Sequence, residues 1–151
     1  MNLLRSLVAS LTLALTLTVA AHAETWTSDY AAAVKKAKAE NKLVLLDFTG
    51  SDWCIWCKRI DADVFSKDSF KAYADKNLVL VTVDFPQGKP LPAAVKAQND
   101  ALAKQYGVEG FPTLIVLDAS GKVIFTQTGY EEGGAEHFLS KFPGSSTKGT
   151  I

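Results

Sequence analysis

Residues 50–58 of the chain read GSDWCIWCK and hold both of its cysteines, at C-x-x-C spacing. They follow a largely apolar run, Leu43–Phe48, which is typical of a buried strand. After them, Ile60 and Val64 stand four residues apart, a spacing that indicates one face of a helix. The pattern therefore predicts a strand, a short loop and then a dithiol at the start of a helix.

The start of a helix is a place where a thiol becomes reactive. Backbone N–H groups of the first turn lack partners, and the helix dipole places about half a positive charge there. Both effects favour the thiolate at Cys54, and the thiolate is the nucleophile. The alternative is a purely structural disulfide, but a bridge from Cys54 to Cys57 closes too short a loop to remove much unfolded-state entropy. We therefore predict a redox-active dithiol.

The N-terminal residues have the features of an export signal. A short basic start precedes the uncharged apolar segment Leu7–Ala20, and Ala21-His22-Ala23 forms an A-x-A cleavage site. The alternative is a membrane anchor, but the apolar segment is shorter than the ~20 residues that a span needs. The expected parts of the chain are a signal peptide, a folded domain and a flexible tail, at residues 1–23, 24–142 and 143–151.

Composition excludes several classes of function. The chain has 16 basic and 16 acidic side chains, so no excess of positive charge indicates a nucleic acid or an anionic lipid surface as partner. Structural zinc needs four ligands, whereas the part after the signal offers two cysteines and His137, so a zinc site would need a dimer. Covalent haem attachment needs a histidine after the second cysteine, where Lys58 stands. We expect a monomer without metal or cofactor.

The rest of the chain alternates helical and strand patterns. Strands are expected at residues 43–49, 78–84, 114–117 and 122–128, with an extended lead-in or short strand at residues 24–26. Helices are expected after the dithiol and at residues 29–40, 66–76, 93–106 and 132–141. Ser28 is the expected N-cap of the helix at residues 29–40. The pattern leaves open whether the helix at residues 93–106 is continuous or broken near residues 98–100. This order predicts an α/β fold with a mixed central sheet flanked by helices on both faces.

Several motifs together resemble the thioredoxin-fold proteins, over residues 26–142. They are a strand ending in LDF at residues 46–48, WCIWCK at residues 53–58, and GFPT at residues 110–113 before a hairpin and a last helix. The TGSDWC approach and the DVFS continuation at residues 63–66 are similar to exported thioredoxin-like proteins and to the C-terminal domain of the transmembrane thiol–disulfide interchange reductases. The resemblance implies a thioredoxin fold and a Cys54–Cys57 disulfide that opens and closes in the reaction.

The resemblance also implies a role for each cysteine and for the residues around them. Cys54 is expected to be the exposed, attacking thiol, and Cys57 to resolve the mixed disulfide. Pro112 is expected to be cis and to face the dithiol, and with Phe111 it would present a backbone edge to an extended substrate. The alternative at this position is a trans proline at the start of a strand.

Two tryptophans flank the attacking cysteine and complete the expected substrate face. Trp56, between the cysteines, is not easily buried together with Cys57, so we expect it to be partly exposed toward a substrate. The alternative for Trp56 is packing against a neighbouring loop. Trp53 is expected on the same substrate-binding surface.

Asp47 is the candidate proton acceptor for Cys57. A carboxylate in an apolar strand is desolvated, and desolvation raises its pKa toward neutrality, where it can hold or release a proton. The alternative is a strand-end aspartate that reaches water.

The chain departs from thioredoxin itself by carrying Ile55-Trp56 in place of Gly-Pro, Leu80 near the place of a lysine, and a longer stretch over Phe85–Asn99.

These features together predict an exported thiol–disulfide oxidoreductase that reduces or isomerises protein disulfides. Its expected partners are cysteine-containing exported proteins and a membrane-bound or soluble thiol electron donor. The expected location is the periplasm, with secretion as the alternative. Two other functions stay open: a reductant for the cysteines of cytochrome c maturation, and a client-binding or chaperone-like module without turnover.

Overall fold

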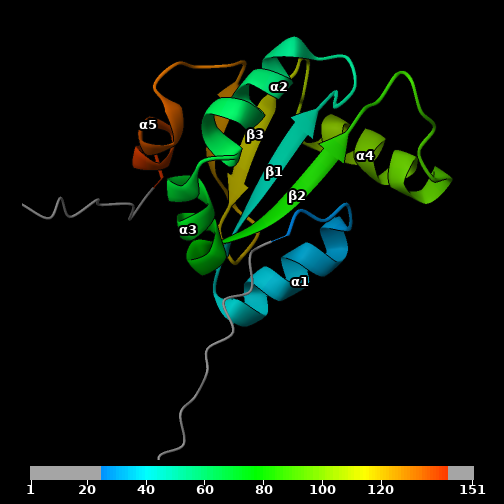
Figure 1. Ribbon diagram of the computed structural model, residues 1–151. Helices are drawn as coiled ribbons and strands as arrows, with labels where there is room; N and C mark the ends of the chain where they lie inside the picture. The colour runs from blue at the N-terminus through cyan, green and yellow to red at the C-terminus, as the bar shows by residue number, and fades with distance from the viewer. Residues whose placement is uncertain (1–24, 143–151) are drawn as a thin grey trace, which may run out of the picture.

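The computed structural model describes residues 25–142 and contains one four-stranded sheet (Figure 1). The strands are β1 (Leu43–Thr49), β2 (Leu78–Asp84), β3 (Thr113–Leu117) and β4 (Val123–Thr128). Their order across the sheet is β2-β1-β3-β4, with β1 parallel to β2 and antiparallel to β3, and β3 antiparallel to β4. The predicted mixed sheet is confirmed. The predicted signal peptide and tail lie outside the described residues.

Helices cover both faces of the sheet, as predicted. They are α1 (Tyr30–Glu40), α2 (Ile55–Ile60), the π-helix η1 (Asp61–Phe65), α3 (Asp68–Asn77), α4 (Ala93–Gln105) and α5 (Gly134–Ser140). Figure 1 shows α3 and α5 on one side of the sheet and α1 and α4 on the other. Within the described part of the chain, no helix is both long and apolar enough to cross a bilayer.

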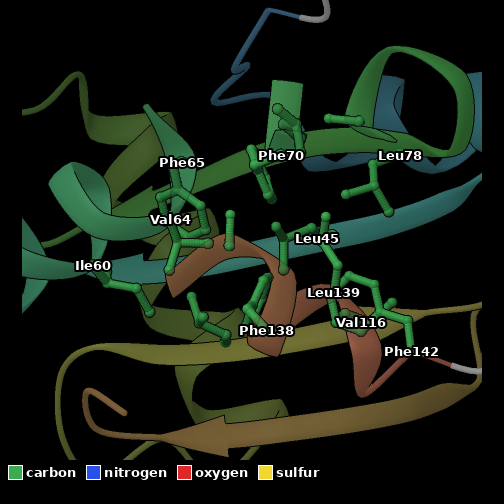
Figure 2. Packing of buried hydrophobic residues seen from close by; sticks show 14 residues of the cluster. Leu45, Ile60, Val64, Phe65, Phe70, Leu78, Val116, Phe138, Leu139 and Phe142 are labelled. Atoms are coloured by element: carbon green, nitrogen blue, oxygen red, sulfur yellow. The ribbon is translucent and has the colours of Figure 1, made fainter. Parts of the chain in front are cut away.

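Each face of the sheet has its own hydrophobic core, because successive side chains of a strand point to opposite faces. On the face under η1, α3 and α5, Leu45 and Val116 pack with aromatic and aliphatic side chains, among them Phe70 and Phe138 (Figure 2). On the other face, even-numbered residues of β1, such as Leu46, pack against α1 and α4. By the same alternation, Asp47 lies on the face of Leu45, next to the helix that follows the dithiol.

One local prediction about the helices is wrong, and a second point that the sequence left open is decided. The N-cap of α1 is Asp29 and not Ser28, since the Asp29 carboxylate accepts a hydrogen bond from the Ala32 N–H at 2.9 Å. Helix α4 is continuous through residues 98–100, where the sequence left a break possible. Asn99 is buried, and its side-chain amide donates to the Asp84 carbonyl oxygen at 2.9 Å.

The extended lead-in contributes to the edge of the sheet. Thr27 forms an isolated parallel bridge with Val81 of β2. The Thr27 N–H donates to the Leu80 carbonyl oxygen, and the Thr27 carbonyl oxygen accepts from the Thr82 N–H. Trp26 beside it packs on Phe65, with 5.0 Å between the ring centroids. This contact fastens the start of the domain to the π-helix behind the dithiol.

Candidate active site

The dithiol and the Pro112 segment come together at one end of the sheet. Strand β1 ends at Thr49, and the chain then enters the loop of residues 50–53 that leads to Cys54. Phe48 at that end pairs with Thr113, the first residue of β3. Pro112 immediately precedes Thr113, and the Phe111–Pro112 peptide bond is cis, as predicted.

Cys54 and Cys57 form a disulfide, with 5.3 Å between their Cα atoms. Cys54 is the N-cap of α2, so the first sulfur lies at the helix start, where its Sγ accepts a hydrogen bond from the Cys57 N–H at 3.2 Å. The expected greater exposure of Cys54 is not seen, since both residues are 5% exposed. In the oxidised pair, the sulfur of Cys54 points inward to its disulfide partner and to the backbone of the first turn.

Asp47 lies in a desolvated position, as predicted. The residue is 8% exposed, and its Oδ1 atom has no hydrogen-bond partner among the described residues. Burial, together with the nearby charges of Asp61 and Asp84, raises the pKa of Asp47 to about 7. The alternative of a solvated strand-end carboxylate is therefore wrong, and Asp47 titrates in the range in which it can exchange a proton near neutral pH.

A cavity of about 380 Å³ connects Asp47 with the second cysteine. Its lining combines polar groups from the ends of β1 and β2 with residues of α2 and η1: Trp26, Asp47, Thr49, Ser51, Cys57, Lys58, Asp61, Phe65 and Thr82. The cavity is large enough for water and offers polar partners, which a bound water requires. Cys57 and Asp47 thus line one cavity that has room for water.

Trp53 is held beside the dithiol by several contacts. Its indole N–H donates to the Phe85 carbonyl oxygen at 2.8 Å, and its ring meets the edge of the Phe111 ring at 5.9 Å between centroids. Phe85 stacks on Phe111 at 5.1 Å. A Cβ atom at Gly50 would lie 2.4 Å from the Trp53 ring, so only glycine fits beneath the indole. We call Trp53, Phe85 and Phe111 the Trp53 cluster.

Trp56 is partly exposed, as predicted, and it also packs against a neighbouring loop, which was the alternative. It is 56% exposed, and its ring also stacks on Tyr130 of the loop after β4, at 5.8 Å and 21° between the planes. The Tyr130 hydroxyl donates to Asp63 Oδ2 at 2.7 Å, and Arg59 Nε donates to the same oxygen at 2.7 Å. The hydrogen bond from Tyr130 to Asp63, a carboxylate that Arg59 also holds, therefore fixes the ring that supports Trp56.

The structure adds site residues that the sequence reasoning did not name. Asp61 stands four residues after Cys57, so helical periodicity would have placed it on the same face. Asp84 pairs with Thr49 at the shared end of two parallel strands, a position that strand alignment could have indicated. Phe85 and Tyr130 come from distant loops, and no local pattern indicates their contacts with the two tryptophans.

Comparison with known proteins assigns the domain to a family. The thioredoxin-like domain family matches residues 30–142. Disulfide bond reductase DsbH of Chlamydia pneumoniae is 40% identical over 116 residues, which are 77% of this chain and 69% of that protein. Thiol:disulfide interchange protein DsbD of Actinobacillus pleuropneumoniae serotype 5b is 32% identical over 108 residues, which are 70% of this chain and 17% of DsbD.

Solved structures agree with this assignment. A DsbH oxidoreductase superposes with a TM-score of 0.74 at 37% identity, over 88% of this chain and 91% of that chain. The reduced C-terminal domain of DsbD from Neisseria meningitidis gives a TM-score of 0.56 at 28% identity, over 77% of this chain and 95% of that chain. The resemblance predicted from residues 26–142 is confirmed: the chain belongs to the thioredoxin-like family.

Proposed function

We propose that this chain, a thiol–disulfide oxidoreductase, reduces disulfide bonds in exported proteins through Cys54 and Cys57. The observation that carries the proposal is the position of the pair: a C-x-x-C disulfide whose first cysteine is the N-cap of α2. The positive end of a helix stabilises a thiolate at that place, and the three-residue separation brings the second sulfur into bonding distance.

The reaction starts from the reduced pair and proceeds in two exchanges. The Cys54 thiolate attacks one sulfur of the client disulfide; a mixed disulfide forms, and the first client thiolate leaves. Cys57 then loses its proton and attacks the Cys54 sulfur, which releases the second client thiolate. The client gains two electrons, and the protein ends with the Cys54–Cys57 disulfide. An external thiol donor must reduce this disulfide before the next cycle.

Asp47 is the proposed proton acceptor for the second exchange. Its pKa of about 7 lets it accept a proton from Cys57 and release it to solvent near neutral pH. The cavity that both residues line supplies the path. Asp61 and Asp84 contribute by keeping the Asp47 proton bound up to a higher pH.

The proposed client surface surrounds the disulfide. Trp53, Trp56 and Ile55 are large apolar side chains that remain exposed, and exposed aromatic groups of this kind mark binding surfaces. Phe111 and the cis Pro112 lie at the same end of the sheet. We propose that an extended client segment lies along this surface with its disulfide over Cys54.

Reduction is the direction that the relatives favour. The name of DsbH describes a disulfide bond reductase, and DsbD is named an interchange protein. Residues 1–23 read as an export signal, so we propose that the chain works in the periplasm, or outside the cell as the alternative. Its partners would be cysteine-containing exported proteins and a membrane-bound or soluble thiol donor.

Insulin reduction with dithiothreitol as the donor tests the proposal. Wild type should accelerate the precipitation of the insulin B chain, Cys54→Ser should abolish the acceleration, and Cys57→Ser should accumulate a mixed disulfide with the client. The exposed aromatic surface also fits a second function, client binding without turnover. A binding module would leave insulin reduction at the background rate in wild type and would keep its client affinity in Cys54→Ser.

A further inference from the structure

Two loops next to the dithiol are joined by a dense set of hydrogen bonds. One is the approach loop, residues 50–53, and the other is the β2–α4 loop, residues 85–92, with Asp84 at its start. The Asp84 carboxylate accepts from the N–H and the hydroxyl of Ser51, at 2.9 and 2.7 Å. The Trp53 indole donates to Phe85 at 2.8 Å. The contacts of Asp52 complete the set.

Asp52 makes the most direct connection between the two loops. Its carboxylate accepts hydrogen bonds from two successive backbone N–H groups, those of Gln87 at 3.0 Å and Gly88 at 2.6 Å. A Cβ atom at Gly88 would lie 3.0 Å from Asp52 Oδ2, so a larger residue at this position would crowd the carboxylate. These two hydrogen bonds lower the pKa of Asp52, which therefore remains ionised and able to accept both.

The contact does not belong to either hydrophobic core. Asp52 is exposed, and it is not a member of either cluster of buried residues. In the loop that it holds, Phe85 is partly buried and packs against the core under α1 and α4. Phe85 is already tied to the end of β1 through its N–H, which donates to the Thr49 carbonyl oxygen at 2.8 Å. The Asp52 contact adds a second tie, because Asp52 precedes Trp53 and Gln87 lies two residues after Phe85. A polar contact one residue before the tryptophan thus joins the two loops that carry Trp53 and Phe85.

We infer that Asp52 is a positioning residue, which holds the β2–α4 loop so that the Trp53 cluster forms one side of the client-binding surface beside Cys54. The inference rests on the proposed function and deepens it, because it assigns client recognition to the loop of residues 85–92. An apolar surface that is ordered before the client arrives binds more tightly than one that must be ordered on binding. Loss of the contact should therefore weaken capture of a protein client more than it slows chemistry at the sulfurs.

The test compares a protein disulfide with a small one. Insulin contacts the surface around the dithiol, whereas 5,5′-dithiobis(2-nitrobenzoate) reaches the sulfurs without it. We expect Asp52→Ala, which removes both hydrogen bonds to the β2–α4 loop, to raise KM for insulin about tenfold, with a much smaller change in kcat. The second-order rate with the small disulfide should change far less than KM. Asp52→Asn retains an acceptor oxygen and should recover part of the loss.

Two further variants keep the test decisive. Gly88→Ala crowds the same contact from the other loop, leaves Asp52 in place, and should raise KM for insulin about two- to threefold. Asp118→Ala is the matched control, because its carboxylate also accepts two backbone N–H groups, at 2.9 and 3.0 Å, in the turn at the opposite end of the sheet. It should leave KM for insulin unchanged.

The outcomes separate this inference from the proposed function. Wild type that fails to reduce insulin contradicts the proposed function. Wild type that reduces insulin while Asp52→Ala has the same KM contradicts the inference alone. The inference is also wrong when Asp52→Ala lowers the rates with both disulfides in parallel, or when Asp118→Ala raises KM as much, because either result indicates a general loss of structure.

Discussion

Burial and two neighbouring charges set the pKa of Asp47. Burial is the larger cause, and the carboxylates of Asp61 and Asp84 are near enough to raise the pKa as well. Leu80, near the place where thioredoxin has a lysine, is buried in the hydrophobic core of that face. The surroundings thus favour the protonated form of Asp47 by desolvation and by repulsion together.

The first prediction concerns the stability of the oxidised protein. Its Asp47 has a pKa of about 7, against an ordinary value of 3.8, so the folded state holds this proton more tightly than the unfolded state does. Stability contributed by the protonated form is complete below pH 4 and is lost as the pH rises toward 7. Over these three pH units, the contribution of Asp47 to the free energy of unfolding falls by about 4 kcal/mol.

Asp47→Asn removes this titration, so the variant should gain stability relative to wild type as the pH rises from 4 to 8. Urea unfolding of both oxidised proteins at pH 4, 6 and 8 measures the difference in the free energy of unfolding. Since the other titratable groups are common to both proteins, their contributions cancel. A difference that stays constant with pH would show that Asp47 titrates normally.

The second prediction concerns Asp61. Removing its negative charge in Asp61→Asn should lower the pKa of Asp47 below about 7, because repulsion by Asp61 is the largest contribution after burial. Carboxyl-carbon NMR of Asp47 across pH 4 to 9 measures the shift directly. Asp118→Asn, at the opposite end of the sheet, should leave the titration in place. If the Asp47 titration were unchanged in Asp61→Asn, the Asp61 charge would not contribute to the raised pKa of Asp47.

At the scale of single residues, the sequence predicts features set by neighbours in the chain and misses contacts with residues from distant segments. The burial of Asp47 follows from the apolar residues on both sides of it in β1. The inward position of the Cys54 sulfur does not follow from the motif, because it depends on the disulfide and on the Cys57 N–H. The contact of Trp53 with Phe85 depends on the course of a loop more than 30 residues away in sequence.

Secondary-structure elements set the position of the second tryptophan. The loop after β4 supplies Tyr130, and the π-helix η1 supplies Asp63, which accepts the Tyr130 hydroxyl. Trp56 on α2 then stacks on a ring that two other elements hold. The support of Trp56 therefore requires three separate elements to pack correctly.

The third prediction separates the two contacts of Tyr130. Tyr130→Phe keeps the ring that stacks on Trp56 but loses the hydroxyl that donates to Asp63, so we expect KM for insulin to rise by about twofold. Tyr130→Ala loses the stack as well, and KM should rise about fivefold, in line with the energy of an aromatic pair. Trp56 fluorescence in a Trp26→Phe, Trp53→Phe background reports the change in its surroundings. Equal KM values in wild type and Tyr130→Ala would contradict the role of the stack.

Elements were predicted more reliably than their ends. Strands β1, β2 and β3 follow from continuous apolar runs, which the sheet buries on both faces. Strand β4 is mostly exposed and follows instead from its place as the second strand of the hairpin. The N-cap of α1 was missed because Ser28 and Asp29 are both good caps, and only the contact with Ala32 decides between them. Polar residues at 98–100 suggested a break in α4, whereas tertiary contact with Asp84 keeps Asn99 within a continuous helix.

At the scale of the whole molecule, the residues that stabilise the fold are different from the exposed apolar residues around the disulfide. The order of the strands could be predicted only through the family resemblance, since strand pairing between distant segments leaves no local pattern. The resulting sheet buries one core under η1, α3 and α5 and another under α1 and α4. The large apolar side chains of residues 53–56 lie outside both cores and are exposed. Substitutions in the two regions should therefore have different effects.

The last prediction compares one side chain of each kind. Phe138 on α5 is buried and contacts the rings of Phe65, Phe70, Phe125 and Phe142. Phe138→Ala should lower the free energy of unfolding by about 3–5 kcal/mol, because it leaves a cavity among these rings. At a temperature where the variant remains folded, its KM for insulin should match that of wild type.

Ile55 lies between the cysteines and is 69% exposed, so it contributes little to either core. Ile55→Ala should change the free energy of unfolding by less than about 0.5 kcal/mol and should raise KM for insulin by about two- to threefold. Urea unfolding and insulin kinetics on both variants give the four numbers needed. If Ile55→Ala lost stability while its KM stayed constant, the exposed apolar residues around the disulfide would belong to the fold rather than to client binding.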